Sequence, residues 1–281
     1  MDEALTLSPA ELAHALELVE QADLIVVAAG AGMGVDSGLP DFRGNEGFWR
    51  AYPALAKSGI DFYAAANPRR FAEAPREAWG FYGHRLNLYR KTRPHAGFEI
   101  LARWGARSEH GLIVYTSNVD GQFQRAGFAD GAIWECHGSL MHLQCTRPCS
   151  EAVWPADEFD PEIDEERCLL LGELPSCPWC GALARPNVLM FGDGSWVDAR
   201  ERQQGRQVLP RLREARKPLV VEIGAGTAVA SVRHFGQGVV SQFGGRLLRI
   251  NVREPRVPQA DDLGLAMGAL AALRQIDEAL G

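Results

Sequence analysis

Short runs of consecutive apolar residues alternate with helical patterns along most of this chain. Such runs predict strands buried on both faces, as in a parallel sheet covered by helices. The four clearest runs are residues 24–29, 112–115, 219–223 and 247–250. Residues 95–104 and 263–280 carry the spacing of amphipathic helices. The alternation predicts an α/β fold with a doubly wound, Rossmann-like parallel sheet.

Two segments depart from this alternation and predict a second, smaller domain. Residues 44–93 are rich in aromatic side chains and Arg and have helical tendencies, whereas residues 141–185 hold five cysteines and many turn formers. The rest of the chain then forms the large domain in three pieces, 1–43, 94–140 and 186–281. Within the second insertion, residues 150–176 carry nine Asp or Glu against one Arg, and we expect a solvated loop there.

Composition narrows the class of protein. The chain has 281 residues, of which 46% are hydrophobic and 23% charged, enough to bury a core without disulfides. The net charge of -7 argues against a broad nucleic-acid footprint, although not against a small cationic pocket. No apolar run approaches the roughly 20 residues of a membrane helix, and the acidic N-terminus predicts no secretory signal. We expect a cytoplasmic protein that binds neither nucleic acid nor membrane.

The cysteines are gathered in one short stretch, between Cys136 and Cys180, which indicates a metal site rather than a secreted disulfide framework. Two close pairs stand out, with 27 residues between them: Cys145 with Cys149, and Cys177 with Cys180. Four thiolates suit a tetrahedral zinc ion whose closed coordination makes it structural rather than catalytic. Free cytosolic thiols are the alternative, and Cys168 is a fallback ligand.

A glycine-rich turn, Gly30-Ala31-Gly32-Met33-Gly34, directly follows the first predicted strand. Glycine lets a backbone approach a pyrophosphate, and a helix beginning here would offer free N–H groups to an anion. The spacing departs from GxGxxG, so a plain tight turn explains this segment about as well.

Longer motifs point to one family. The turn belongs to the run GAGMGVDSGLPDFRG, and three further runs follow in order: TSNVDGQFQRAG from Thr116, ECHGSL from Glu135 and RPNVLMFGD from Arg185. Together with the paired cysteines, these runs resemble the sirtuin family of NAD-dependent protein deacylases, in its bacterial type. The resemblance spans roughly residues 20–254.

The resemblance implies three catalytic residues. In this family an acyl-lysine oxygen attacks the nicotinamide ribose, and a histidine acts as base on the ribose hydroxyls. His137 matches that histidine, and it follows an apolar strand expected over residues 132–136. Asn118 would position the ribose or a water, and Asp120 would engage the nicotinamide pocket. A structural His and a plain Asn- and Asp-rich turn are the alternatives.

The resemblance also implies an NAD site. Phe42 would shield the reacting ribose from water, and Arg43 would face phosphate. The residues assigned to NAD are Gly30, Ala31, Gly32, Asp41, Phe42, Arg43, Ser117, Asn118, Asp120, Gly224, Ala225, Gly226 and Asn251. The chain departs from the family pattern at Gly34, Ser117, Ala225 and Gly226, where the family usually has Ser, Gln, Thr and Ser.

Residues 188–192 match the family segment that pairs with an acyl-lysine peptide by strand addition. The Leu189 carbonyl would accept a hydrogen bond from the lysine amide, with Phe191 and Gly192 beside it. An apolar buried strand is the alternative for this segment.

A second motif concerns the acyl group. Tyr82 and Arg85 are three residues apart and share one helix face. They resemble the motif of sirtuins that remove succinyl and malonyl groups, because Arg can clamp a carboxylate while the Tyr hydroxyl adds a donor. An amphipathic helix with a surface Arg explains the same spacing.

The resemblance therefore implies an NAD-dependent protein-lysine deacylase that acts on acyl-lysine proteins, uses NAD, holds structural zinc and favours acidic acyl groups. The products would be nicotinamide and 2′-O-acyl-ADP-ribose. The departures at the NAD site leave room for an ADP-ribosyltransferase or NAD hydrolase on the same scaffold. A non-enzymatic NAD-sensing module is a further alternative, which the set of Asn118, Asp120 and His137 argues against.

Overall fold

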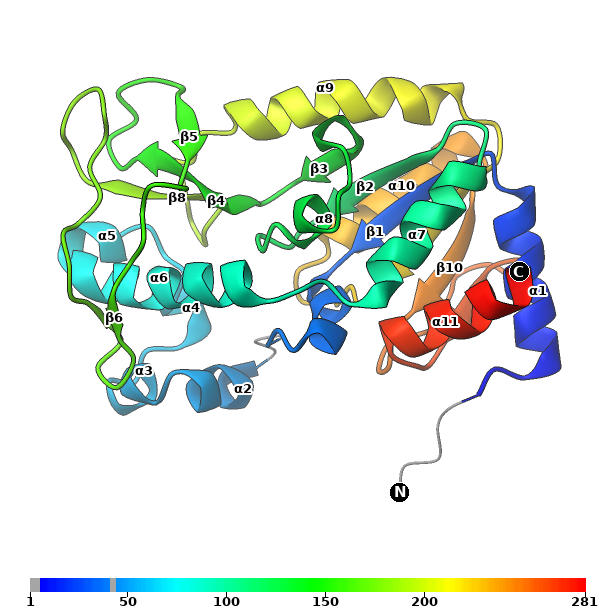
Figure 1. Ribbon diagram of the computed structural model, residues 1–281, viewed down its shortest axis with the longest axis horizontal. Helices are drawn as coiled ribbons and strands as arrows, with labels where there is room; N and C mark the ends of the chain where they lie inside the picture. Colours follow the sequence, from blue (N-terminus) through cyan, green and yellow to red (C-terminus); the bar gives the residue numbers. More distant parts are fainter. Residues whose placement is uncertain (1–5, 41–43) are drawn as a thin grey trace.

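The computed structural model describes residues 6–40 and 44–281, and a six-stranded sheet lies at its centre (Figure 1). The strands follow the order β11-β10-β9-β1-β2-β3, and every neighbouring pair is parallel. Their bounds are β1 Leu24–Ala29, β2 Leu112–Thr116, β3 Ile133–Glu135, β9 Pro218–Ile223, β10 Arg246–Ile250 and β11 Leu263–Leu265. The doubly wound α/β fold expected from the sequence is confirmed.

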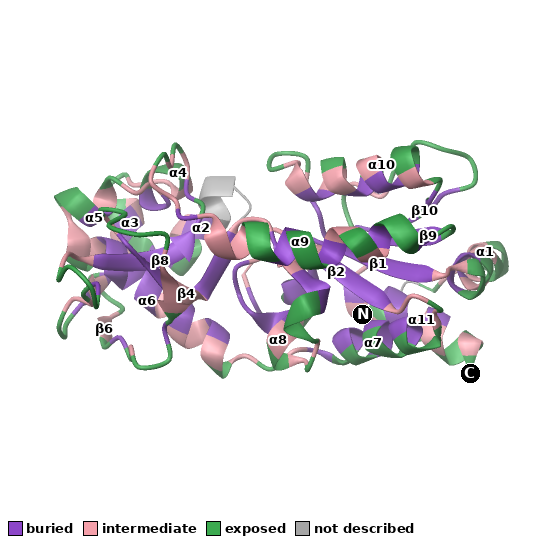
Figure 2. Ribbon diagram, turned by 90° about the horizontal axis from the view of Figure 1, so that it is seen from above, coloured by how far each residue is buried: buried purple, intermediate pink, exposed green. Residues whose placement is uncertain are grey.

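Helices cover both faces of this sheet (Figure 2). One face packs against α1 (Pro9–Gln21), α7 (Ala96–Arg107) and α11 (Ala269–Leu280), and the other against α9 (Ala199–Glu214) and α10 (Ser231–Phe243). Strand β1 shows why the apolar run is continuous. Its alternate side chains enter the two cores in turn, Ile25 and Val27 on one face, Leu24 and Val26 on the other.

The C-terminal segment differs from the helix expected over residues 263–280. Residues 263–265 form the edge strand β11, and the helix begins only at Ala269. Leu263 and Leu265 are buried on the sheet, and between them the backbone meets a neighbouring loop. A Cβ on Gly264 would lie 2.1 Å from the carbonyl oxygen of Pro255, so the close approach requires glycine.

The two segments that interrupt the alternation pack together at one end of the sheet, on the left in Figure 1. The first forms α2 (Gly44–Ala51), α3 (Pro53–Lys57), α4 (Phe62–Ala65), α5 (Arg70–Glu73) and α6 (Pro75–Lys91). The second lies among β4 (Gly138–Cys145), β5 (Val153–Pro155), β6 (Ile163–Asp164), β7 (Leu169–Leu170) and β8 (Ala184–Val188). They share a core rich in aromatic side chains, including Phe48, Trp79 and Phe81.

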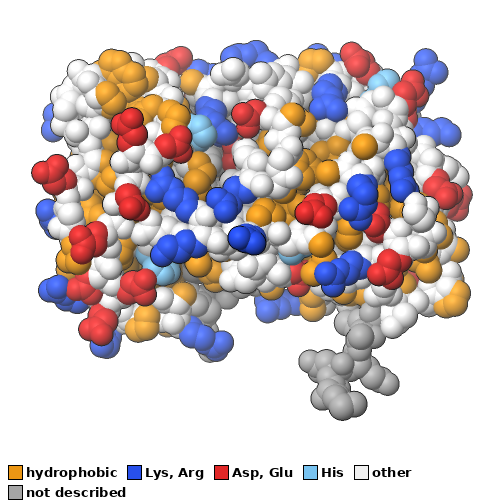
Figure 3. Space-filling view, viewed as in Figure 1, with side chains coloured by type: hydrophobic (Ala, Val, Ile, Leu, Met, Phe, Trp, Pro, Cys, Tyr) orange, Lys and Arg blue, Asp and Glu red, His pale blue; other side chains and the backbone are white. Residues whose placement is uncertain are grey.

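The acidic stretch 150–176 is solvated, as expected, but it is not a featureless loop. Its acidic side chains are exposed apart from Asp164, whereas Ala156 and Leu170 are buried in the core beside α6. On the molecular face seen in Figure 3, cationic and anionic side chains are interspersed. Within the described ranges, no helix combines the length and apolar character needed to cross a membrane.

Candidate functional site

A cavity of about 560 Å³ lies where the parallel strands end. Residues just after the ends of four strands line its wall. These residues are Gly30 and Ala31 after β1, Ser117, Asn118 and Asp120 after β2, His137 after β3, and Gly224, Ala225 and Gly226 after β9. Since the carboxyl ends of parallel strands share one edge of the sheet, residues far apart in sequence meet here.

The two glycine-rich turns touch each other. The Gly32 N–H donates to the Gly224 carbonyl at 3.1 Å, and a Cβ on Gly32 would lie 2.6 Å from the Gly224 Cα. The segment after the first turn is a 3₁₀-helix, η1 (Ala31–Ser37), rather than the α-helix N-terminus that the sequence suggested. Glycine is therefore required here by the packing of one turn against the other.

His137 is held on both sides of its ring. Its Nε2 lies 3.2 Å from the hydroxyl of Ser231, the first residue of α10, and the Ser117 carbonyl accepts a hydrogen bond from the imidazole. Burial lowers the pKa of His137 below its usual value, so the ring is neutral at neutral pH. A neutral imidazole with one nitrogen engaged by a carbonyl presents the other as a base.

Asn118 and Asp120 occupy the loop after β2. The Asn118 side-chain amide donates to the Gly30 carbonyl at 3.0 Å and so ties this loop to the first glycine turn. Asp120 is buried and accepts from the Gln122 N–H at 2.9 Å. Burial raises the pKa of Asp120 to about 6, and the Glu135 carboxylate adds to the effect.

Helix α6 contributes a cation to the cavity. Arg85 is only 7% exposed and lines the wall, which rules out the surface position considered from the sequence. Its Nε and Nη2 donate to the Tyr89 hydroxyl at 3.0 and 2.8 Å. The guanidinium carbon lies 5.2, 5.8 and 5.4 Å from the ring centres of Phe81, Tyr82 and Tyr89. The Tyr82 hydroxyl is buried without a hydrogen-bond partner.

The segment after β8 borders the same cavity. Leu189 and Phe191 line it, while Gly192 does not and instead forms part of a turn with a φ of 68°. The Leu189 N–H donates to the His137 carbonyl at 2.9 Å. Leu189 is 37% exposed, so a wholly buried strand does not describe this segment.

A buried ion pair that sequence reasoning missed holds this turn. Arg185 donates to both carboxylate oxygens of Asp193, at 2.8 and 3.0 Å, and both side chains are almost fully buried. The carboxylate also accepts from the backbone N–H of Met190. Both residues belong to the RPNVLMFGD run, but their pairing has no signal in the spacing alone.

Asn251, which the sequence assigned to the NAD site, does not line the cavity. The Asn251 amide donates to the Ala225 carbonyl at 2.8 Å and accepts from the N–H groups of Arg253 and Glu254. Its side chain therefore organises the two loops rather than lining the cavity. Thr227, which sequence reasoning missed, lines it instead and donates to Glu254 at 3.0 Å.

Three of the residues assigned to NAD or substrate that the structure describes do not line this cavity. They are Gly32, Gly192 and Asn251. Asp41, Phe42 and Arg43 lie outside the described residues. Among the lining residues that the sequence did not single out are Tyr63, Tyr89, Thr227 and Glu254. Of these, only Tyr89 has a signal in the pattern, since it stands one helical turn after Arg85.

The four paired cysteines meet at the far end of β4. Their sulfurs all lie within 4.8 Å of one another, with Cys145 and Cys180 at 3.6 Å and Cys149 and Cys177 at 3.7 Å. A tetrahedron with Zn–S bonds of about 2.3 Å separates its sulfurs by about 3.8 Å, so the cluster fits a structural zinc ion. Cys168, the fallback ligand, is buried beside α6 and takes no part in the cluster.

Comparisons with known proteins agree on one family. The profile of the Sir2 family matches residues 30–229. An NAD-dependent protein deacylase of Pyrococcus furiosus is 29% identical over 253 residues, covering 89% of this chain and 90% of that protein. The mitochondrial NAD-dependent protein deacylase sirtuin-5 of the dog is 33% identical over 192 residues, covering 63% and 58%. A crystal structure of a Sir2 homologue–NAD complex aligns with a TM-score of 0.70 at 26% identity, covering 95% and 94% of the two chains.

Proposed function

This chain belongs to the Sir2 family, and on that premise we propose that it is an NAD-dependent protein-lysine deacylase. It would consume NAD, water and an acyl-lysine protein, and release nicotinamide, the protein with its lysine deacylated and 2′-O-acyl-ADP-ribose. Bound NAD would supply the electrophilic ribose carbon that accepts the acyl oxygen. The observation that carries the proposal is the single cavity that brings His137, Asn118 and Asp120 together with two glycine-rich turns and Arg85.

The walls of the cavity suit a dinucleotide. Gly30, Ala31 and Ser117 would hold it from one side, and the turn from Gly224 to Gly226 from the other. A Cβ on Gly226 would meet nothing within 4 Å, so the backbone there faces open space in which a diphosphate can approach it. Asn251 would act indirectly, by fixing the Ala225 carbonyl and the loop that carries Glu254.

His137 is suited to be the base. It is neutral, its ring is fixed by the Ser117 carbonyl, and its Nε2 is directed at a hydroxyl, that of Ser231. We assign to it removal of a proton from a ribose hydroxyl, which takes the place of Ser231 when NAD binds. Asn118 would place the ribose or a water, and Asp120 would border the nicotinamide.

The pocket on α6 supports a preference for acidic acyl groups. A succinyl or malonyl carboxylate would accept from Arg85 and from the Tyr82 hydroxyl, the buried donor that has no partner in the structure. An acetyl group would reach neither. The acyl-lysine backbone would pair with Leu189, whose carbonyl would accept from the lysine amide N–H.

The test incubates the protein with NAD and matched peptides carrying acetyl-, malonyl- or succinyl-lysine, and reads the products by mass. We expect free lysine and O-acyl-ADP-ribose, formed fastest from the acidic peptides. ADP-ribose attached to a peptide or to the protein, with the acyl group retained, would instead indicate an ADP-ribosyltransferase. Consumption of NAD without peptide, giving free ADP-ribose, would indicate an NAD hydrolase.

The acyl preference is tested separately with Arg85→Met, which keeps the length of the side chain and removes its charge. We expect the ratio of succinyl to acetyl turnover to fall at least tenfold, since a charge-assisted contact is lost. Arg93→Met, at an exposed position just beyond α6, is the matched control and should leave the ratio unchanged. An unchanged ratio in Arg85→Met would refute the carboxylate clamp and leave the deacylase proposal intact.

A further inference from the structure

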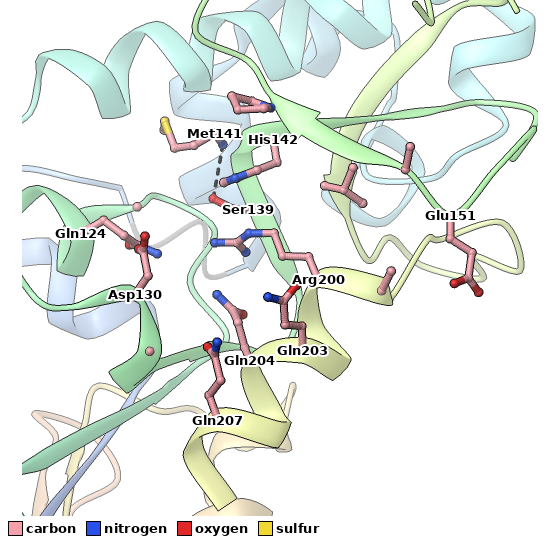
Figure 4. Close-up of a pocket in the computed structure, with 16 residues that line it drawn as sticks. Gln124, Asp130, Ser139, Met141, His142, Glu151, Arg200, Gln203, Gln204 and Gln207 are labelled. Atoms are coloured by element: carbon pink, nitrogen blue, oxygen red, sulfur yellow. Dashed lines mark hydrogen bonds between the residues drawn. The ribbon is translucent and has the colours of Figure 1, made fainter. Parts of the chain in front are cut away.

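A second cavity, of about 690 Å³, lies beside the loop that follows β2 and carries Asp120. It shares no lining residue with the first cavity. Gly121, the neighbour of Asp120, lines it, as does Ser139, two residues after His137. Its walls come from α8 (Gln122–Arg125), the 3₁₀-helix η2 (Asp130–Ala132), β4, the segment around β5, and α9 (Figure 4). The proposed deacylase reaction uses none of these residues.

One face of α9 is directed into this cavity. Arg200, Gln203, Gln204 and Gln207 follow the spacing i, i+3, i+4, i+7 of a helix face, and all four line the wall. In Figure 4 they rise from the helix toward the open space, while Gln124 and Asp130 stand on the opposite wall. Gln204 is already engaged with Glu135, but the other three Gln amides make no hydrogen bond within the described chain.

The inner end holds two buried polar atoms without partners. Arg200 forms an ion pair with the buried Glu135 at 2.6 Å through Nη2, yet its Nη1 is buried and unpaired. The Nδ1 of His142, on β4, is likewise buried and unpaired. Burial and the nearby Arg200 lower the pKa of His142 to about 4, so the ring is neutral. An oxygen acceptor placed here would satisfy the Arg200 nitrogen and, with the appropriate tautomer, that of His142.

The charges around the cavity restrict the class of ligand that can supply this acceptor. Glu135 already neutralises Arg200, so the inner end has little excess positive charge for a phosphate or a polyanion. The opposite wall carries Asp130, whose carboxylate makes no ion pair among the described residues. Glu151, at the outer end, is engaged with Arg202 at 3.2 Å. A ligand must therefore bring an acceptor to Arg200 and a donor, preferably cationic, to Asp130.

We infer that this cavity is a second small-molecule site, and that it takes a free polar α-amino acid. The carboxylate accepts from Arg200 Nη1 and from His142 at the inner end, and the ammonium faces Asp130. The amides of Gln124, Gln203 and Gln207, which both donate and accept, contact the polar side chain. The site is separate from the NAD cavity, so binding requires neither NAD nor turnover.

Calorimetric titration of the full zinc-loaded chain, without NAD, tests this inference. The probes are glutamine and serine, with N-acetylglutamine lacking the ammonium and glutamine α-amide lacking the carboxylate. We expect saturable one-site binding of at least one free amino acid. For glutamine, each analogue should bind at least tenfold more weakly. No saturable binding of either amino acid, or equal binding of an analogue, would overturn the inference.

Two variants locate the site. Arg200→Lys keeps a cation beside Glu135 but removes the unpaired guanidinium nitrogen, and Asp130→Asn removes the exposed carboxylate. We expect each to weaken binding at least tenfold, whereas Asp157→Asn, an exposed acid outside the cavity, leaves it unchanged. Thermal unfolding checks that the variants fold. Because Asp130 is exposed, Asp130→Asn still tests the site if Arg200→Lys fails to fold. Unchanged affinity in a folded variant would contradict the assignment.

Discussion

The Nε2 atom of His137 lies 3.2 Å from the hydroxyl oxygen of Ser231, which begins α10. With the Ser117 carbonyl on the ring as well, the imidazole is fixed between two loops at the carboxyl edge of the sheet. A serine hydroxyl is a good substitute for a ribose hydroxyl, because both are neutral donors and acceptors. If His137 is the base, as proposed, its Nε2 already faces a hydroxyl before NAD binds.

From this relationship we predict a large difference between two variants. His137→Ala should lower turnover by about 10²–10⁴-fold while NAD still binds, since loss of a general base costs about that much. Ser231→Ala should lower turnover less than about fivefold, the effect of one hydrogen bond of about 1 kcal/mol, because Ser117 still holds the ring. Deacylation rates and calorimetric NAD affinity measure both. Equal losses in the two variants would show that Ser231 takes part in the chemistry.

Asp120 should make the fold less stable as pH rises. Its pKa is raised from 3.8 to about 6 by burial, so the folded state binds a proton more tightly than the unfolded state. The loss of folding free energy caused by ionising Asp120 is absent below about pH 4, grows between about pH 4 and 6, and reaches its full size above about pH 6. Asp120→Asn should therefore stabilise the protein by about 2–3 kcal/mol at pH 7. Urea unfolding of both proteins from pH 4.5 to 7.5 tests this, and a constant difference would contradict it.

The glycine turns differ in what each position tolerates. Gly32→Ala would place a Cβ 2.6 Å from the Gly224 Cα, where backbone must move, so we expect a loss of about 1–3 kcal/mol in unfolding free energy. Gly226→Ala meets nothing within 4 Å and should change stability by less than about 0.5 kcal/mol. Urea unfolding compares the two, and similar losses would mean that the turns are not packed as described.

The strands and the strand-end loops were predictable because burial on both faces leaves a continuous apolar run, as in β1. The loops that follow such strands were then expected at one edge, and Asn118, Asp120 and His137 do meet there. The edge strand β11 was not predictable, because Leu-Gly-Leu is too short to distinguish a strand from the start of a helix.

Other parts of the site depend on tertiary contacts that leave no local pattern. In the sequence, Ser231 has no feature beyond that of a helix start, and its contact with His137 depends on how α10 packs. Asn251 stands where a ribose ligand was expected, yet its amide is occupied by the loops around it. The sequence left Arg85 open between a carboxylate clamp and a surface charge, and its burial among aromatic rings excludes the surface position.

The zinc cluster yields a prediction about which thiols matter. Cys149→Ser should abolish zinc binding and lower stability markedly, because the metal contributes folding energy that a three-thiolate site loses. Cys168→Ser changes a buried thiol outside the cluster and should retain one zinc per chain. Metal content after gel filtration measures both. Retained zinc in Cys149→Ser would mean that the four sulfurs do not share an ion.

Tyr89 and Tyr82 make a matched pair around Arg85. The Tyr89 hydroxyl accepts two hydrogen bonds from the guanidinium, whereas the Tyr82 hydroxyl is buried without a partner. Tyr89→Phe should therefore destabilise the free enzyme by about 1–3 kcal/mol, because a charged donor loses an acceptor. Tyr82→Phe should leave its stability unchanged or slightly higher.

With a succinyl-lysine peptide bound, the order of effects should reverse. A ligand carboxylate replaces the acceptor that Tyr89→Phe removes, so the peptide should stabilise this variant more than it stabilises the wild type. In Tyr82→Phe the carboxylate loses a donor, and the peptide should stabilise that variant less. Thermal unfolding with saturating succinyl or acetyl peptide measures both effects, with the acetyl peptide as control. If succinyl and acetyl peptides shift the two variants equally, the acyl carboxylate does not reach Arg85.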